Sequence, residues 1–480
     1  MQTSGNDGHW ALEELGSVDL GDKRRTARLI KLCGQLSAKP ESSINQACGD
    51  WAETKAAYRF FQNDTVDVQT ILAAHRAKTA ERAGQHRTVL AIQDTSYLVY
   101  TSHRQTTGLG KLSLKKGKHV EKIHSHGLVM HSCLAVTTDG VPLGLLDQQI
   151  FAREEAPEDR PPHRKVLPIE EKESYRWLAS LKQAWPVRGS AQLVTICDRE
   201  ADIYELFELS AQLAAPMLVR ANYDRPINNR SMYAEKDIMK LWPHLARHPC
   251  VGRFAVEVPA RRGTKHATPR PPRIATVEMR FVAFTLNPPK RLSSTSPNLA
   301  MSAIYVREQD PPAGEPPLEW MLLTNLPIAT FAQAYEKVQW YCLRWRIEMY
   351  HKVLKSGFRI EHCRLGEAQR LIRYVTVMSI IAWRLFLLTL IARTHPDAPC
   401  TTLLTDQEWQ VLYCTVHRTT ALPPQPPTLH EAIIWIARLG GFLARTNDGP
   451  PGTISLWRGW KRLTDLTQGW LLATGGATCG

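Results

Sequence analysis

Two aspartates of the chain come directly after short apolar segments. Asp94 follows Thr88–Gln93, and Asp198 follows Gln192–Cys197. Two divalent ions held by a few carboxylates, roughly 3.5–4 Å apart, activate an attacking oxygen and stabilise a leaving oxygen in phosphodiester chemistry. Magnesium keeps several of its waters, so few protein ligands are needed. Asp94 and Asp198 are therefore candidate metal ligands; the alternative is that each aspartate only caps the turn or helix that follows it.

A third carboxylate lies on a helix that we expect from Tyr335 to about Lys355. At about 100° per residue, five residues of this helix fall within a stripe roughly 80° wide. The stripe consists of Tyr341, Arg344, Glu348, Lys352 and Lys355. One acid beside a tyrosine and three cations suits a metal ligand next to a path for phosphates. The alternative is a solvated helix face on which Glu348 forms ion pairs with residues four positions away.

A second stripe of the same predicted helix is apolar. It consists of Val338, Cys342, Trp345 and Met349. Since apolar stripes face the core, we expect these four side chains to anchor the helix.

The elements before residue 70 are predicted to be short helices, over Trp10–Leu15, Lys23–Leu36 and Asp50–Phe61. Asp22 is the expected N-cap of the second helix. Its first two turns carry cations that oppose the helix dipole, namely Lys23, Arg24, Arg25 and Arg28. Phosphate contact would explain this arrangement, and a solvated charged face is the alternative.

The segments that must hold the two aspartates are predicted to form a mixed α/β sheet. Strands are expected over Thr88–Gln93, Gly127–Val136, Val141–Phe151 and Gln192–Cys197, with a hairpin turn at residues 138–140. Glu154–Glu173 is a charged connection, and helices are expected over Ser174–Trp185 and from Ala201 to about Ala214. Further β-like segments, at Gly252–Val258, Ile274–Leu286, Ala300–Val306 and Trp320–Leu326, indicate an insertion over about 221–325.

The amino-acid composition indicates which kinds of partner the protein binds. Sixty Lys and Arg against 46 Asp and Glu give a net charge of +14, which favours a polyanion such as nucleic acid. The ten cysteines form no CxxC pair, so we expect neither a structural zinc site nor a redox motif. The N-terminus has no signal-peptide pattern, and Arg384 interrupts the apolar stretch Tyr374–Ala392. We therefore expect a cytoplasmic protein, with that stretch as a buried helix and no membrane partner.

Eight motifs in order along the chain resemble the DDE transposases of the IS-four group, in particular those of the Tn-five type. They are GDKRRTARL (21–29), AYRFFQN (57–63), AIQDTSYL (91–98), CDREADIYE (197–205), LVRAN (218–222), EWMLLTNLP (319–327), YCLRWRIEMYHKVLKSG (341–357) and IARLGGF (436–442). Tyr341, Arg344, Glu348 and Lys355 match the family's Y-x2-R-x3-E-x6-K signature. The first 50 residues match only in patches, and Glu348 is followed by Met349 and Tyr350 where an acid and an aromatic are more usual.

The resemblance implies three domains. A helical domain over 1–70 would bind DNA ends, an RNase-H-like catalytic domain would span 71–390 with the β insertion inside it, and a helical domain over 391–480 would pair two subunits. Asp94, Asp198 and Glu348 would hold two Mg²⁺ ions, for which Mn²⁺ could substitute. Trp320 would stack on a flipped base. The implied DNA-binding residues are Arg24, Arg25, Arg28, Arg220, Trp320, Tyr341, Arg344, Lys352 and Lys355.

The implied reaction is cut-and-paste transposition through a DNA hairpin, on double-stranded transposon ends and target DNA, by a homodimer in a synaptic complex. Two alternatives stay open on the sequence. One is a catalytically silent DNA-binding regulator with the same fold, and the other is a metal-dependent nuclease that cuts DNA without joining it. A general nucleic-acid scaffold is favoured by the charge alone.

Overall fold

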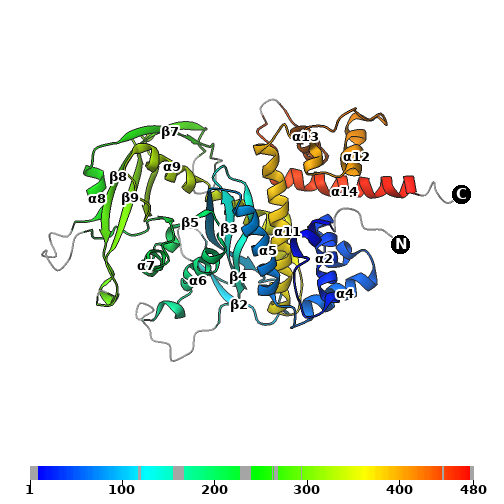
Figure 1. Cartoon of the computed structure of the whole chain (residues 1–480), viewed down its shortest axis with the longest axis horizontal. Coiled ribbons are helices and arrows are strands. Elements are labelled where there is room, and N and C mark those ends of the chain that lie inside the picture. The colour runs from blue at the N-terminus through cyan, green and yellow to red at the C-terminus, as the bar shows by residue number, and fades with distance from the viewer. Residues whose placement is uncertain are drawn as a thin grey trace.

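Ten strands in one continuous sheet form the centre of the protein (Figure 1). The computed structural model describes residues 9–116, 121–154, 167–227, 239–261, 263, 269–292, 294–445 and 448–475. The helices within residues 23–62 lie on the same side of the molecule as those within residues 406–475 (Figure 1). The predicted connection Glu154–Glu173 lies mostly outside the described residues.

The N-terminal part consists of short helices, and side chains cap those that begin at Lys23, Ile44, Trp51 and Val68. The helices are α1 (His9–Leu15), α2 (Lys23–Ala38), α3 (Ile44–Cys48), α4 (Trp51–Gln62) and α5 (Val68–Ala83). Asp22 caps α2 as expected, since its side chain accepts a hydrogen bond from the Arg24 amide at 2.8 Å. Asp50 and Asp67 cap α4 and α5 in the same way. Helices α3 and α5 were not predicted from the sequence.

The first half of the sheet has the strand arrangement of an RNase-H-like fold, as expected. Antiparallel strands β4, β3 and β1 are followed by β5 and β6, which run parallel to β1. Gly140, with a φ of +95°, turns the chain between β3 and β4. These strands are β1 (Thr88–Val99), β2 (Gly110–Lys116), β3 (Glu121–Thr137), β4 (Pro142–Phe151), β5 (Gln192–Cys197) and β6 (Met217–Arg220).

The predicted β insertion extends this sheet. Strand β10 (Glu319–Thr324) pairs with β6, and β9 (Leu299–Glu308), β8 (Arg273–Leu286) and β7 (Gly252–Val258) follow in antiparallel order. The short helix α8 (Leu241–Arg247) packs near β8. The insertion therefore extends the sheet beyond β6, which separates it from β5 and β1, the strands next to the candidate aspartates.

Helices cover both faces of the sheet. Alternate residues of β1 face opposite sides: Leu90 and Ile92 pack in the core that includes α11 (Ala368–Thr394), whereas Val89 and Ala91 face α6 (Tyr175–Ala184). Helix α7 (Tyr204–Gln212) adds to the α6 side. Side chains that alternate along β1 therefore lie in two different cores, one with α11 and one with α6.

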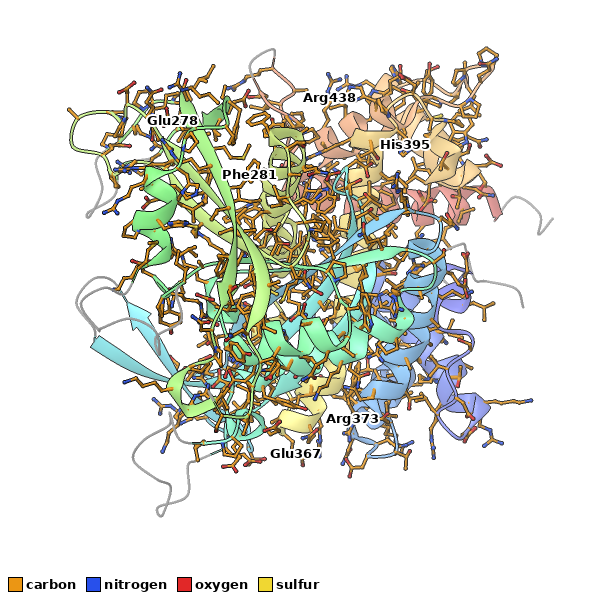
Figure 2. The ribbon with its side chains drawn as sticks, turned by 60° about the vertical axis from the view of Figure 1, so that its left-hand side comes forward. Glu278, Phe281, Glu367, Arg373, His395 and Arg438 are labelled. Carbon is orange, nitrogen blue, oxygen red and sulfur yellow. The ribbon has the colours of Figure 1, made fainter. Side chains whose placement is uncertain are left out.

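The long helix α11 is apolar and is a core element. It is long and apolar enough to cross a membrane, but 78% of its most apolar window is buried inside the protein. In Figure 2 it runs from Glu367 at the lower side to His395 at the upper side. Arg373 near its start donates to the carbonyls of Phe61 and Val66, both at 3.1 Å, and so joins α11 to the end of α4.

The C-terminal part is helical and packs around its own apolar cluster. It contains α12 (Asp406–His417), α13 (Leu429–Leu439) and α14 (Thr453–Gly475). Lys461 of α14 lies 3.6 Å from Glu41, so this part also contacts the N-terminal helices. The domain boundaries at 70 and 390, and the limits of the insertion, stay predictions.

Candidate active site

Two neighbouring parallel strands bring the candidate aspartates together. Ile92 of β1 is paired with Ile196 of β5, and Asp94 and Asp198 each stand two residues further on. Asp94 is not at a strand end as predicted: β1 continues to Val99 because it stays paired with β3 up to that residue. Asp198 does follow the last residue of β5, and its carboxylate accepts the Glu200 amide at 2.8 Å. Asp198 therefore also caps a turn, as the alternative interpretation held.

The segment that carries Glu348 is not the single helix that was predicted. Helix α9 (Phe331–Cys342) ends before Arg344, α10 (Trp345–Lys352) carries Glu348, and a π-helical turn spans Val353–Gly357. The turn at 343–344 and the π turn both change the rotation between successive side chains. The predicted stripe from Tyr341 to Lys355 is thus divided among three segments.

The predicted apolar anchor is wrong for two of its four residues. Val338 is buried and Met349 is half-buried, but the Trp345 side chain is 60% exposed and Cys342 is exposed. Ile347 and Tyr350 bury α10 instead. The break before Trp345 rotates α10 relative to α9, which explains why the stripes calculated for one helix fail.

The three carboxylates share one electrostatic environment. Burial is the largest cause that raises the pKa of Asp94 to about 7, and the negative charges of Asp198 and Glu348 add to it. The Arg344 charge and the Thr95 amide act in the opposite direction. A buried acid whose ionisation is opposed by two other acids is a place where a cation is favourable.

His351 lies beside Asp94 and was missed in the sequence. It follows Glu348 by three residues on α10, and its Nδ1 is 3.8 Å from Asp94 Oδ2. Burial lowers the pKa of His351 to about 3, so the ring is neutral at ordinary pH. Its other nitrogen lies 3.3 Å from the Ser132 hydroxyl. The helical spacing from Glu348 was the available signal.

Cations gather around the acids, but several are already bonded to the protein. Arg344 forms an ion pair with Glu348. Tyr341 is buried near Arg344 and Arg220, and both arginines hold its pKa down while burial, the largest cause, raises it. Arg220, on β6, donates to the Glu319 carbonyl at 3.1 Å. Tyr341, Arg344 and Arg220 therefore form one group next to the aspartates.

The two lysines predicted to contact phosphate differ in environment. Lys352 is exposed. Lys355 Nζ donates to the Tyr97 carbonyl at 2.7 Å and lies 3.6 Å from Glu361. In this arrangement Lys355 holds the end of β1, whereas Lys352 is directed to solvent.

Trp320 and the N-terminal arginines lie on other elements. Trp320 is half-buried on β10, opposite Val306 of β9. Arg24, Arg25 and Arg28 lie on α2; Arg24 is exposed, Arg25 donates to the Leu20 carbonyl at 2.9 Å, and Arg28 pairs with Glu53 at 2.6 Å. Among the described residues, these arginines form no hydrogen bond or ion pair with the three carboxylates.

The donor set fits a hard divalent cation. Three carboxylates offer oxygen ligands of the type that Mg²⁺ and Mn²⁺ prefer, and the charges of Asp198 and Glu348 add to burial in raising the pKa of Asp94. In the part of the chain that the structure describes, no group of three or more His, Cys, Asp or Glu side chains is already arranged around a metal position. Glu348 is paired with Arg344 instead, so it must exchange that partner to act as a ligand.

A cavity of about 360 Å³ opens beside Glu348. It lies between α10, α11 and the C-terminal helices, and Glu348 and Lys352 form part of its wall. Most of its lining is apolar, with Trp345, Trp457 and Trp460 among the residues. The face of α10 that carries Glu348 therefore borders the C-terminal helices.

Asp202 is a further residue with a structural role that the sequence did not predict. Its side chain is buried, accepts the amides of Asn222 and Tyr223 at 2.8 and 3.0 Å, and pairs with Arg225 at 2.5 Å. It therefore fixes the loop after β6, next to Arg220. Its place in the motif that begins with Asp198 was the signal that could have indicated it.

Comparison with known proteins matches three family models in succession. A "Transposase DNA-binding" model matches residues 7–66, a "Transposase DDE domain" model matches 176–383, and a "Transposase Tn5 dimerisation domain" model matches 380–478. The DDE match includes Asp198 and Glu348 and begins after Asp94. A solved structure, the piggyBac transposase synaptic complex with hairpin DNA, aligns over 98% of this chain and 73% of that chain at 9% identity. Its TM-score of 0.33 is too low to support an argument.

Proposed function

Because this chain is a DDE transposase of the Tn5 type, we propose that it moves DNA by cut-and-paste transposition through a hairpin intermediate. As a DDE transposase it depends on divalent metal, binds DNA and forms a homodimer. The alternative nuclease and regulator functions become outcomes of the tests below.

The single observation that carries the proposal is that the negative charges of Asp198, which follows β5, and Glu348, on α10, add to burial in raising the pKa of Asp94 on β1. We assign Asp94, Asp198 and Glu348 as the ligands of two Mg²⁺ ions, with Mn²⁺ as a substitute. When bound, such a pair supplies an activated oxygen nucleophile and stabilises the leaving oxygen. The protein then has to align the DNA strands and neutralise phosphate charge.

Arg344 links DNA binding to the acids in this proposal. It is paired with Glu348 and lies in the group with Tyr341 and Arg220. Guanidinium binds phosphate in a bidentate manner. When Arg344 binds a DNA phosphate, the Glu348 carboxylate loses its partner and becomes available as a ligand. Lys352 is exposed one turn further along α10 and contacts the next phosphates.

The reaction proceeds in four phosphoryl transfers at each DNA end. Water attacks one strand and leaves a free 3′-OH, which attacks the opposite strand and closes a hairpin. A second water opens the hairpin, and the 3′-OH then attacks target DNA. Trp320 is the stacking platform for the base that must leave the helix when the hairpin forms. Arg24, Arg25 and Arg28 contact the DNA end from α2, and the reaction takes place in the cytoplasm.

A strand-transfer assay with precut ends tests the proposal against a nuclease. Purified protein is incubated with Mg²⁺, a supercoiled target plasmid and duplexes that carry the ends of the surrounding element with an exposed 3′-OH. We expect joined products, which Mn²⁺ also supports and EDTA prevents. Cleavage of uncut ends without any joining of precut ends would favour the nuclease. Binding of both substrates without cleavage or joining would favour the regulator.

A further inference from the structure

One buried arginine contacts the segments next to both candidate aspartates. Arg176 is the second residue of α6, and its side chain is 7% exposed. Its Nε donates to Thr95 Oγ1 at 2.9 Å, and its Nη2 donates to Glu200 Oε2 at 2.8 Å. Its remaining nitrogen donates to the Glu173 carbonyl at 2.8 Å. Thr95 is adjacent to Asp94, and Glu200 follows Asp198 by two residues.

The Thr95 contact continues as a directed chain of hydrogen bonds beneath β1. Arg176 can only donate, so the Thr95 hydroxyl accepts from it. The hydroxyl donates to His131 Nδ1, 2.9 Å away, because the neutral ring carries its proton on the other nitrogen, which faces the acceptor oxygen of Gln93. The other nitrogen of His131 then donates to Gln93 Oε1 at 3.3 Å. Burial, followed by the Arg176 charge, keeps the pKa of His131 well below its ordinary value. The His131 ring is therefore neutral, as this series of hydrogen bonds requires.

These hydrogen bonds hold the backbone at Asp94 from the face of β1 opposite to the Asp94 side chain. Successive side chains of a strand point to opposite faces, so Gln93 and Thr95 face α6 while Asp94 faces α10. Both neighbours of Asp94 are thus bonded, directly or through His131, to Arg176. Their positions fix the backbone from which the Asp94 carboxylate extends.

The Glu200 contact fixes the second aspartate. The Glu200 amide donates to Asp198 Oδ1 at 2.8 Å, so the position of residue 200 orients the Asp198 carboxylate. Arg176 binds the Glu200 side chain and thereby links this turn to Thr95. The two carboxylates come from different strands, and Arg176 is bonded to the neighbours of both.

We propose that Arg176 is a positioning residue that sets the separation and orientation of Asp94 and Asp198 and so determines the affinity of the site for divalent metal. The inference rests on the proposed function, because it takes these aspartates as metal ligands. Groups that orient metal ligands typically contribute roughly 10–100-fold to metal affinity or activity. A buried arginine that only stabilises the fold would lower the fraction of folded protein and leave metal affinity unchanged.

The test measures Mn²⁺ binding to the full-length protein by the EPR signal of free Mn²⁺, together with DNA-end binding and thermal unfolding. We expect Arg176→Gln to raise the Mn²⁺ concentration for half saturation by roughly 10-fold or more, with DNA-end binding retained. Arg176→Lys keeps the charge but reaches fewer partners, so we expect a smaller increase. Nicking of end DNA over a Mn²⁺ titration should show the same shift in midpoint.

Each contact can also be removed separately. Thr95→Val and Glu200→Ala remove the two side-chain acceptors without touching Arg176, and each should raise the half-saturating Mn²⁺ concentration. In the Arg176→Gln background both changes should have little further effect, because residues of one network are not additive. Arg373→Gln is the matched control: Arg373 is also a buried, hydrogen-bonded arginine, but its partners are Phe61, Val66 and Asp64.

The outcomes separate this inference from the proposed function. If Arg176→Gln and Thr95→Val leave the Mn²⁺ midpoint unchanged and only lower stability or the amount of active protein, Arg176 is structural and the inference is wrong. If the unmodified protein binds Mn²⁺ through Asp198 and the midpoints shift as expected, but no DNA is cleaved, the inference stands and the proposed function fails. If the unmodified protein binds no more Mn²⁺ than Asp198→Ala does, both the inference and the proposed function are wrong.

Discussion

Asp94 is held in a state that is unfavourable without a bound cation. Its pKa is raised from 3.8 to about 7 by burial and by the other two acids. At pH values above 7 the ionised side chain therefore costs the metal-free protein on the order of 4 kcal/mol of stability. The penalty is absent below pH 3.8 and grows as the pH rises toward 7. Such strain is expected where charged groups serve chemistry rather than stability.

Replacing this acid should stabilise the metal-free protein while removing activity. We expect Asp94→Asn to raise the thermal midpoint in EDTA at pH 8, because the neutral amide avoids the penalty. The gain should shrink as the pH is lowered from 7 to 5. Mn²⁺ should raise the midpoint of the unmodified protein and not that of the variant, since ligands stabilise the state that binds them. Differential scanning calorimetry measures both effects, and a lower midpoint for Asp94→Asn in EDTA at pH 8 would contradict this assignment.

Trp320 offers a second test at the scale of a single residue. If it stacks on a flipped base, Trp320→Ala should reduce hairpin formation by roughly 10–100-fold, because stacking contributes about 1–3 kcal/mol per base. The first nick needs no flipped base and should change little. Trp320→Phe keeps an aromatic face and should retain most of the activity. Denaturing gels resolve nicked and hairpin products, and equal loss of both would indicate a general packing defect.

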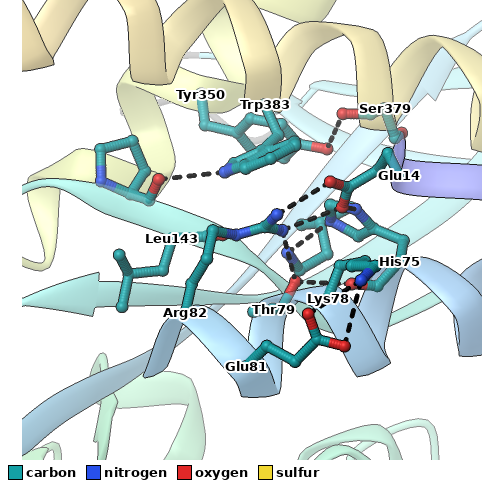
Figure 3. Close-up of polar contacts among 12 residues, drawn as sticks. Glu14, His75, Lys78, Thr79, Glu81, Arg82, Leu143, Tyr350, Ser379 and Trp383 are labelled. Carbon is teal, nitrogen blue, oxygen red and sulfur yellow. Dashed lines mark hydrogen bonds and ion pairs between the residues drawn. The ribbon is translucent and has the colours of Figure 1, made fainter. Parts of the chain in front are cut away.

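Helix α1 is joined to the catalytic sheet by a buried polar cluster (Figure 3). His75 Nδ1 lies 2.5 Å from Glu14, and its Nε2 accepts the Leu145 amide at 2.9 Å. The ring is therefore neutral and donates to Glu14. Arg82 adds two hydrogen bonds to Glu14, at 2.8 and 2.9 Å, and lies over the Trp383 ring. The cluster connects the N-terminal helices to β4 and α11.

The pH dependence of this cluster has a defined sign. Burial alone would raise the pKa of Glu14, but hydrogen bonds from Arg82 and His75 lower it to about 2. Its contribution is complete above pH 4.5 and is lost as the pH falls toward 2. We expect Glu14→Gln to lower the free energy of unfolding by about 3 kcal/mol at pH 6, and by much less at pH 2.5. Chemical denaturation at both pH values tests this.

Glu81→Gln is the control for that measurement. Glu81 lies on the same helix as His75 and pairs with Lys78 at 2.8 Å on the surface. Exposed pairs contribute about 0–1 kcal/mol, so we expect a small effect at either pH. Equal effects of the two substitutions at pH 6 would show that the Glu14 cluster does not hold α1 to the sheet.

Most of the strands and helices around the site could be predicted from the sequence. The pattern of apolar and turn residues in the sequence predicted β5, α6 and the hairpin of β3 and β4, because periodicity and turn residues are local signals. The end of β1 was misplaced although residues 95–99 contain good strand formers. The breaks around α10 contain no proline, and only Gly357 at the end of the π turn is a helix-breaking residue. Arg176 and His351 gave little local signal, because their importance comes from residues distant in sequence.

At the scale of the whole molecule, the C-terminal helices lie far along the chain from β1 and border the cavity beside Glu348. Helix α14 carries three exposed apolar residues near its end: Trp470 at 42%, Leu471 at 46% and Leu472 at 79% exposure. They lie within the match to the dimerisation model. Exposed apolar groups of this kind mark interaction surfaces.

Charges introduced at this surface should separate DNA binding from pairing. We expect Leu471→Glu combined with Leu472→Glu to leave thermal stability and single-end binding nearly unchanged, while paired-end complexes are lost. Gel-shift analysis distinguishes the two species. Leu443→Glu, at a side chain that is 65% exposed outside α14, serves as the control. Unchanged paired-end complexes in the α14 variant would place the dimer interface elsewhere.

The most direct test of the central claim uses DNA that carries the ends of the surrounding element. Purified protein is incubated with this DNA in Mg²⁺ or EDTA, beside Asp198→Ala. We expect nicked and hairpin products with the unmodified protein in Mg²⁺. We expect neither product with the unmodified protein in EDTA or with Asp198→Ala, although DNA ends are bound under all three conditions. Binding without any cleavage by the unmodified protein in Mg²⁺ would contradict the assignment of Asp94, Asp198 and Glu348 as a catalytic metal site and would favour a DNA-binding regulator.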